Sequence, residues 1–289
     1  TSLRMSDLGY QNNAQSSLAI SYNNLDEYVS TLTHAIKTPE PAYEKIGVKV
    51  GDDYRQLNTN ILQIENEYYS SIRPKRTINP GERPTTALQE RGVEYIEIRA
   101  LDLNPFEPVG INQQEIRFLD LFATYCLLRE SPQLEKCDLH ASKENLRKVV
   151  YDGRNTATQL CNWGKSVSLK DWATEKLEQM QPIAELFDRA HGGTNYAEAL
   201  AHQQEKVDNP DATPSARILA TLESRNQGFF QFAMDQALAH RDHFLSRQRC
   251  DDTNQRLEAL AADSLAEQAA GEAADQQSFE DYLADYFRD

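Results

Sequence analysis

The stretch VEYIEIRALDLNPFEPVG, residues 93–110, decides the fold, because its first nine residues alternate as a strand with one polar face does. Ile96 and Ile98 fall on one face of this expected strand. The other face carries polar side chains, namely Tyr95, Glu97 and Arg99. With a repeat of two residues, Glu97 and Arg99 project side by side, about 7 Å apart at their Cβ atoms.

Glu97 and Arg99 together suit a site for a metal ion and a phosphoryl group. A hard carboxylate oxygen can hold Mg²⁺, and the permanently charged arginine fork offsets the charge that develops on transferring phosphoryl oxygens. The alternative is an ion pair on a solvated sheet face, which is a common arrangement and contributes little to stability. Spacing alone leaves both interpretations open.

A second strand is expected over residues 59–69, with Leu62 and Ile64 on one face. Its other face is polar and carries Gln63, Glu65, Glu67 and Tyr69. If the two strands are neighbours, their polar faces merge into an acidic floor that suits a magnesium-nucleotide site; otherwise the sheet simply has one wet face. Hydrolysis by the carboxylate pair Glu65 and Glu67 is a weaker alternative, since nothing in the sequence indicates a raised pKa.

Between these strands, SIRPKRTINPGERP at residues 71–84 is rich in Pro, Gly and Arg, which predicts a loop. Arg73, Lys75 and Arg76 place three positive charges within four positions. Such a cluster suits a grip on phosphates, and a solvated turn explains it equally well.

Apolar residues at helical spacing predict an amphipathic helix over residues 24–37. A second helix is expected over residues 113–130, where Asn112 and Glu115 form a capping box at its start. The second of these helices is apolar almost all round. We therefore expect it to be buried against the sheet, with Cys126 as a core filler.

From residue 142 onward strand signals disappear. Helices are expected over residues 142–151, 169–190, 195–207, 215–223, 229–246 and, in the tail, 254–287. The predicted fold class is therefore α+β, an antiparallel sheet portion followed by a mainly helical portion. We divide the chain into a sheet-bearing part of the catalytic domain (1–141), a helical part of the same domain (142–250) and an acidic helical tail (251–289).

The 289 residues carry a net charge of −15, and residues 251–289 hold 11 acidic and two basic side chains. A field of this sign disfavours nucleic acid and anionic membrane surfaces as partners. No apolar run reaches the roughly 20 residues that a membrane span needs. Four cysteines without metal-like spacing predict free thiols in a reducing cytoplasm.

Familiar catalytic motifs are missing, since the sequence contains no GxxxxGK[ST], GxGxxG, HExxH or GxSxG. His240 and His243, three apart on one expected helix, are better explained as surface residues than as metal ligands. The sequence opens TSLRMSDLGYQNNAQSS, without an initiator Met or a signal-peptide pattern, so we expect it to be part of a larger protein.

VEYIEIRALDLNPFEPVG at residues 93–110, followed by QEIRFLDLF at residues 114–122, resembles glutamate-cysteine ligase (gamma-glutamylcysteine synthetase) of the proteobacterial type. Four further blocks agree in order and approximate spacing: SLRMSDLGYQN (2–12), AIKTP (35–39), LQIENEYYSSIRPKR (62–76) and SARIL (215–219). The resemblance runs to about residue 220 and is strongest between residues 58 and 122.

That resemblance implies a fold similar to glutamine synthetase, in which the polar inner face of an antiparallel sheet binds metal ions, ATP and amino acids. It implies Mg²⁺ as cofactor and glutamate, cysteine and ATP as small-molecule partners. The implied reaction joins the side-chain carboxylate of L-glutamate, through an acyl phosphate, to the amine of L-cysteine, which is the first step of glutathione biosynthesis. Phosphorylation supplies the leaving group that a carboxylate lacks.

Carried over by position, the resemblance implies that Glu97 ligates magnesium and that Arg99 contacts the transferring phosphate. Arg4 and Tyr10 match positions of the amino-acid pocket, and Tyr69 matches a tyrosine of the cysteine pocket. The family's other metal-ligating glutamates lie in an amino-terminal portion that this sequence does not contain, so we expect this polypeptide alone to be inactive. The alternative from another class is a non-catalytic helical interaction module on a ligase-derived scaffold, whose acidic tail docks a basic partner.

Overall fold

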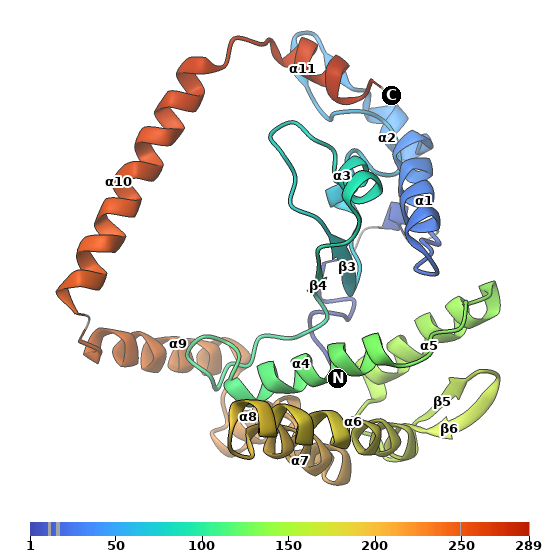
Figure 1. Cartoon of the computed structure of the whole chain (residues 1–289), viewed down its shortest axis with the longest axis vertical. Helices are drawn as coiled ribbons and strands as arrows, with labels where there is room; N and C mark the ends of the chain where they lie inside the picture. Colours follow the sequence, from blue (N-terminus) through green and yellow to red (C-terminus); the bar gives the residue numbers. More distant parts are fainter. Residues whose placement is uncertain (11–12, 16–17, 249, 289) are drawn as a thin grey trace. The chain divides into compact units, whose positions relative to one another are not determined.

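The computed structural model describes residues 1–10, 13–15, 18–248 and 250–288, which form helices and short two-stranded sheets (Figure 1). The chain divides into two compact units. Unit 1 comprises Thr1–Asn13, Ser70–Arg73 and Ile98–His240, and unit 2 comprises Ala14–Tyr69, Pro74–Glu97 and Arg241–Asp289. The mixed α and β character is confirmed, whereas the division at residues 141 and 250 stays a prediction.

Unit 1 is mainly helical. Its elements are α4 (Gln113–Leu128), α5 (Lys136–Asp152), β5 (Gln159–Asn162), β6 (Lys165–Ser168), α6 (Leu169–His191), α7 (Asn195–Asp208), the 3₁₀ turn η3 (Pro210–Ala212), α8 (Pro214–Ser224) and most of α9 (Phe229–Ser246). The helices expected between residues 142 and 246 are thereby confirmed. The hairpin of β5 and β6 was not expected; its turn places Trp163 and Gly164 at positive φ, 50° and 77°, which suits a tight two-residue connection.

Helix α4 packs on α6 and α7. It presents one stripe to them, with Leu121 fully buried and Tyr125 one turn later 8% exposed. The expectation that this helix is buried all round against the sheet is therefore wrong. Leu127 is 82% exposed, and Cys126 is exposed rather than a core filler. An apolar composition does not decide which faces of a helix find partners.

Unit 2 is built around α1. Its elements are the 3₁₀ turn η1 (Asn13–Gln15), α1 (Leu25–Lys37), α2 (Pro41–Ile46), β1 (Lys49–Val50), β2 (Asp53–Tyr54), the 3₁₀ turn η2 (Glu65–Glu67), α3 (Pro84–Arg91), α10 (Asp251–Ala274) and α11 (Phe279–Tyr286). Helix α1 begins where the Asn24 side chain accepts a hydrogen bond from the Glu27 amide. It buries Val29, Leu32 and Ile36 against Leu62, which confirms the amphipathic helix over residues 24–37.

The strand expected over residues 59–69 is not formed. The Ile61 amide donates to the Thr38 carbonyl at 2.8 Å and the Leu62 amide to the Ala35 carbonyl at 3.3 Å, so this segment bonds to the end of α1. Residues Glu65–Glu67 then make the turn η2. Leu62 is buried in the core beside α1, and among the described residues no strand pairs along this segment.

Strands β3 (Ile72–Lys75) and β4 (Tyr95–Ile98) form a two-stranded sheet. The strand expected over residues 93–101 is thus confirmed in β4. The loop expected over residues 71–84 is wrong for its first part, because β3 lies there despite Pro74. Proline is tolerated in so short a pair, since only some of the backbone N–H groups take part in pairing.

The tail expected as one helix over residues 254–287 consists of two. Helix α10 buries no residue, whereas α11 buries Leu283. No helix in the described part of the chain combines the length and apolar character that crossing a bilayer requires.

The packing of α4 predicts a contrast between two leucines six positions apart on the same helix. Leu121→Ala opens a cavity in the core of unit 1 and is expected to lower the free energy of unfolding by about 2–5 kcal/mol. Leu127→Ala, the matched control on the exposed side, is expected to change it by about 0.5 kcal/mol or less. Urea unfolding followed by circular dichroism measures both, and equal losses would contradict this packing.

Candidate functional site

Glu97 lies in β4, Arg99 directly follows that strand, and both residues are half-buried. The Glu94 amide donates to the Lys75 carbonyl at 2.9 Å and the Arg99 amide to the Ser71 carbonyl at 2.7 Å, so β3 and β4 run antiparallel. Glu97 belongs to unit 2 and Arg99 to unit 1. The side-by-side projection of their side chains therefore stays a prediction.

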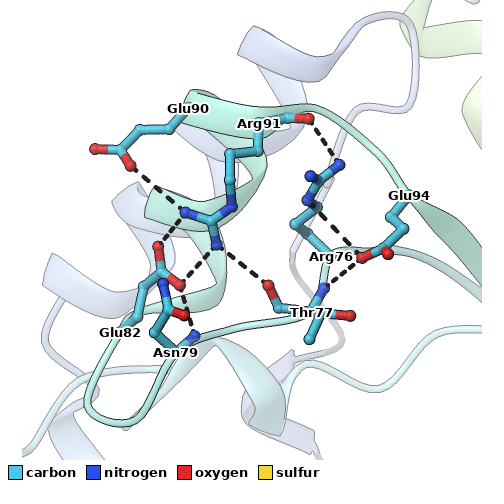
Figure 2. Close-up of polar contacts among 7 residues, drawn as sticks. All are labelled: Arg76, Thr77, Asn79, Glu82, Glu90, Arg91 and Glu94. Atoms are coloured by element: carbon cyan, nitrogen blue, oxygen red, sulfur yellow. Dashed lines mark hydrogen bonds and ion pairs between the residues drawn. The ribbon is translucent and has the colours of Figure 1, made fainter.

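An ion-pair network within unit 2 fastens the segment before α3 to the residues that lead into β4 (Figure 2). Arg91, at the end of α3, donates two hydrogen bonds to Glu82, each 2.7 Å long. Arg76 donates to the Arg91 carbonyl at 2.9 Å, and its Nε lies 3.8 Å from a Glu94 carboxylate oxygen. The Thr77 amide donates to that same carboxylate at 2.9 Å. The approach to β4 is thus held by two carboxylates and two guanidinium groups.

These contacts shift the pKa values of the network. Hydrogen bonds from Arg91, and next from the Asn79 amide, lower the pKa of Glu82 to about 2. Hydrogen bonds from Thr77 lower the pKa of Glu94, and the Glu82 carboxylate raises the pKa of Arg91. All three groups are therefore charged at neutral pH, which keeps the bidentate pair intact.

The three cations predicted as a phosphate grip have separate environments. Arg73 is buried in β3, 6% exposed, and Lys75 is half-buried at the end of the same strand. Arg76 is engaged with Arg91 and Glu94. A buried and a hydrogen-bonded arginine do not make the freely exposed patch that the sequence suggested.

Arg4 and Tyr10 lie on a tight turn of unit 1, and both are exposed. The turn requires glycine at position 9, because a Cβ atom on Gly9 would lie 2.0 Å from the Arg4 carbonyl oxygen. The turn is held on α5 by Tyr151, whose hydroxyl donates to the Asp7 carboxylate at 2.8 Å and accepts from the Asp7 amide at 3.0 Å. The two predicted pocket residues are thus presented together on one structured turn.

Tyr69 lies in unit 2, just after η2, and its amide donates to Gln15 Oε1 at 2.9 Å. The side-chain amide of Gln15 in turn donates to the Glu67 carbonyl at 2.9 Å. Glu65 does not share a polar floor with Glu67: its carboxylate is buried and accepts from Arg83 at 2.8 Å. The alternative in which Glu65 and Glu67 act as a hydrolytic pair is therefore not supported, because Glu65 forms a buried ion pair with Arg83.

Metal-binding clusters are absent from the part of the chain that the structure describes, since no three His, Cys, Asp or Glu side chains gather there in a suitable way. His240 is half-buried, with its Nε2 2.8 Å from the Pro105 carbonyl, and His243 is exposed. Glu97 is therefore the residue on which the magnesium prediction rests.

Sequence reasoning missed the network of Glu82, Arg91, Arg76 and Glu94 and the buried cluster around Glu65. In the first case, Arg76 and Glu82 belong to a stretch that was taken as a loop, where charge spacing has no fixed geometry, and their partners Arg91 and Glu94 lie beyond it. In the second, the partners are up to 221 positions apart in the sequence. A capping or periodicity signal does not reach across such distances.

The Glu82–Arg91 pair predicts a specific dependence of stability on pH. The pKa of Glu82 is lowered from 4.5 to about 2 on folding, so its stabilising contribution is complete above pH 4.5 and is lost as the pH falls towards 2. Glu82→Gln is expected to flatten the fall in stability over this interval, measured by thermal unfolding at a series of pH values. Glu90→Gln is the control, since Glu90 is 64% exposed and 3.6 Å from Arg91. Identical slopes for wild type and Glu82→Gln would refute the assignment.

Comparison with known proteins shows which family the chain is similar to. A family model described as glutamate-cysteine ligase matches residues 1–149. A glutamate–cysteine ligase of Alcanivorax borkumensis is 90% identical over 100% of the chain and 56% of its own length. One from Azotobacter vinelandii is 50% identical over 99% of the chain and 54% of its own length. The chain thus spans about half the length of the curated relatives it matches.

Two solved structures are similar to the chain in fold. A glutamate–cysteine ligase from Francisella tularensis, crystallised in complex with AMP, matches 99% of the chain and 56% of its own chain, with 36% identity and a TM-score of 0.90. A bifunctional glutathione synthetase from Pasteurella multocida matches 85% of the chain and 27% of its own, with 20% identity and a TM-score of 0.61, which is a likeness of fold alone. On the family match and these relatives, the chain belongs to the glutamate-cysteine ligase family.

Proposed function

We propose that the chain contributes to the ATP-dependent ligation of L-glutamate to L-cysteine, the first step of glutathione biosynthesis. The observation that carries the proposal is the match of 99% of the chain, at a TM-score of 0.90, to a ligase crystallised with AMP. Glutamate, cysteine and ATP are the substrates in this proposal, and the cytoplasm is the compartment. The short β3–β4 pair would belong to a larger antiparallel sheet of the glutamine-synthetase kind.

Glu97 is the proposed magnesium ligand. Its half-buried carboxylate is a hard oxygen donor on a strand, and β3 pairing together with the Glu82–Arg91 network fixes the approach to that strand. Bound Mg²⁺ would supply charge neutralisation at the phosphates of ATP. A single carboxylate fits one position of such a site, so we propose that the chain needs further ligands from the full-length protein and is inactive by itself.

Arg99 is the proposed catalytic arginine. Its amide is fixed to Ser71 at 2.7 Å, which anchors the backbone from which the side chain extends. A guanidinium group keeps its charge at all working pH values and can hold two phosphoryl oxygens at once. In this role it would stabilise the phosphoryl group as it passes from ATP to the glutamate side chain.

The amino-acid substrates are assigned to the exposed turn of unit 1 and to the end of η2 in unit 2. Arg4 offers a cation for a substrate carboxylate, and Tyr10, 55% exposed, offers a ring and a hydroxyl. Tyr69 is proposed for the cysteine pocket. Support comes from the fixed backbone of each segment, through Gly9 in the turn and Gln15 beside Tyr69.

Replacement of Glu97 separates this proposal from a non-catalytic interaction module. In the full-length protein, Glu97→Gln keeps the size of the side chain and removes its charge, and is expected to lower Mg-ATP-dependent amide formation about 10²-fold or more. Glu90→Gln on α3, an exposed acid of the same unit, is the control and is expected to leave the rate unchanged. Coupled ADP release and product chromatography measure both. Full activity of Glu97→Gln would favour the interaction module.

A further inference from the structure

Helix α11 is docked on unit 2, whereas the helix before it is not packed. Helix α10 buries no residue. Leu283 of α11 is buried, and the Phe279 ring meets the Tyr54 ring edge-on, with centroids 4.9 Å apart. Glu280 accepts from Lys49 at 3.0 Å. Local side-chain contacts therefore dock this helix.

At the other end of α11, the Tyr286 hydroxyl donates to Glu65 Oε2 at 3.3 Å. The Glu65 side chain is only 3% exposed, and its other oxygen accepts from Arg83 at 2.8 Å and from Thr85 at 2.7 Å. A buried carboxylate requires such partners, since each missing hydrogen bond leaves part of its charge uncompensated. Tyr286 is the donor on Oε2 among the contacts that the structure records for the described residues.

Burial, and next the charge of Glu65, raise the pKa of Tyr286 to about 12. The phenol therefore keeps its proton well above neutral pH. At neutral pH the Tyr286 hydroxyl can therefore donate to the Glu65 carboxylate.

Glu65 is the first residue of η2, and this turn leads into Tyr69. The Tyr68 amide donates to the Glu65 carbonyl at 3.2 Å. Gln15 bridges the end of the turn, because its side chain donates to the Glu67 carbonyl and accepts from the Tyr69 amide, both at 2.9 Å. A shift of Glu65 would therefore be passed through a turn of five residues to the backbone of Tyr69.

We propose that Tyr286 is a positioning residue for cysteine recognition: through Glu65 and η2 it sets the place of Tyr69, so that α11 acts as a clasp on the cysteine pocket. This inference rests on the proposed function, because Tyr69 is assigned to that pocket there. Tyr286 itself touches no substrate in this assignment. Its effect is expected on cysteine affinity, separately from phosphoryl transfer.

The test is Tyr286→Phe in the full-length protein, which removes one hydroxyl and keeps the ring. The Michaelis constant for cysteine is expected to rise about three- to fivefold, as for the loss of one weak hydrogen bond to a charged group. The kcat and the Michaelis constant for ATP are expected to stay within about twofold. Tyr282→Phe is the matched control, because Tyr282 lies on the same helix with its ring centroid 6.0 Å from that of Tyr286, and it is expected to leave all three constants unchanged.

An unchanged Michaelis constant for cysteine in Tyr286→Phe overturns the clasp, and so does an equal change for cysteine and ATP or an equal effect of Tyr282→Phe. Thermal unfolding of each variant checks that the fold is retained. If a variant melts early, hydrogen exchange of the Tyr68 and Tyr69 amides in the folded protein decides the matter: faster exchange in Tyr286→Phe alone supports the clasp, and equal exchange refutes it. A wild-type protein that makes no glutamyl-cysteine amide would instead contradict the proposed function.

Discussion

A buried carboxylate, that of Glu65, joins three separate segments of unit 2. Glu65 is 5% exposed and accepts hydrogen bonds from Arg83 and Thr85 of the α3 entry and from Tyr286 of α11. Because a buried charge without partners is strongly destabilising, the three donors must stay together for this part of the chain to keep its shape. One side chain thus joins a turn, the start of a helix and a helix about 220 positions away in the sequence.

The approach to β4 is held in a different way, by exposed and half-exposed charges that form a connected network. Arg91 binds Glu82 through two short hydrogen bonds, and Arg76 links Arg91 to Glu94 three residues before Glu97. Isolated surface ion pairs contribute little, but a connected bidentate set fixes geometry as well as energy. The metal-ligand role proposed for Glu97 requires such support, since small displacements of ligand atoms weaken metal binding.

The long helices and β4 could be predicted from the sequence, because local periodicity and capping determine them. Asn112 and Glu115 form the capping box that starts α4, and Gly192 is the cap that ends α6. The strand wrongly expected over residues 59–69 and the missed contacts of Glu65 have one cause, which is that partners distant in the sequence decide them. Leu62 is buried in the core beside α1 instead of lying in a paired strand. For the candidate site, the sequence indicated which residues to consider and the segments that carry them. It did not indicate the contacts that Glu65 and Arg76 make.

The most direct test of the ligase assignment measures whether an oxygen atom of the glutamate side chain is transferred to the released phosphate. In the reaction proposed for the full-length protein, glutamate labelled with ¹⁸O in its side-chain carboxylate attacks the γ-phosphorus of ATP and releases ADP, so a labelled oxygen becomes the bridge of an acyl phosphate. Attack by the cysteine amine then expels phosphate with that oxygen. Mass spectrometry is predicted to find one ¹⁸O in the phosphate for each amide formed, and unlabelled phosphate released alongside the amide would contradict the account.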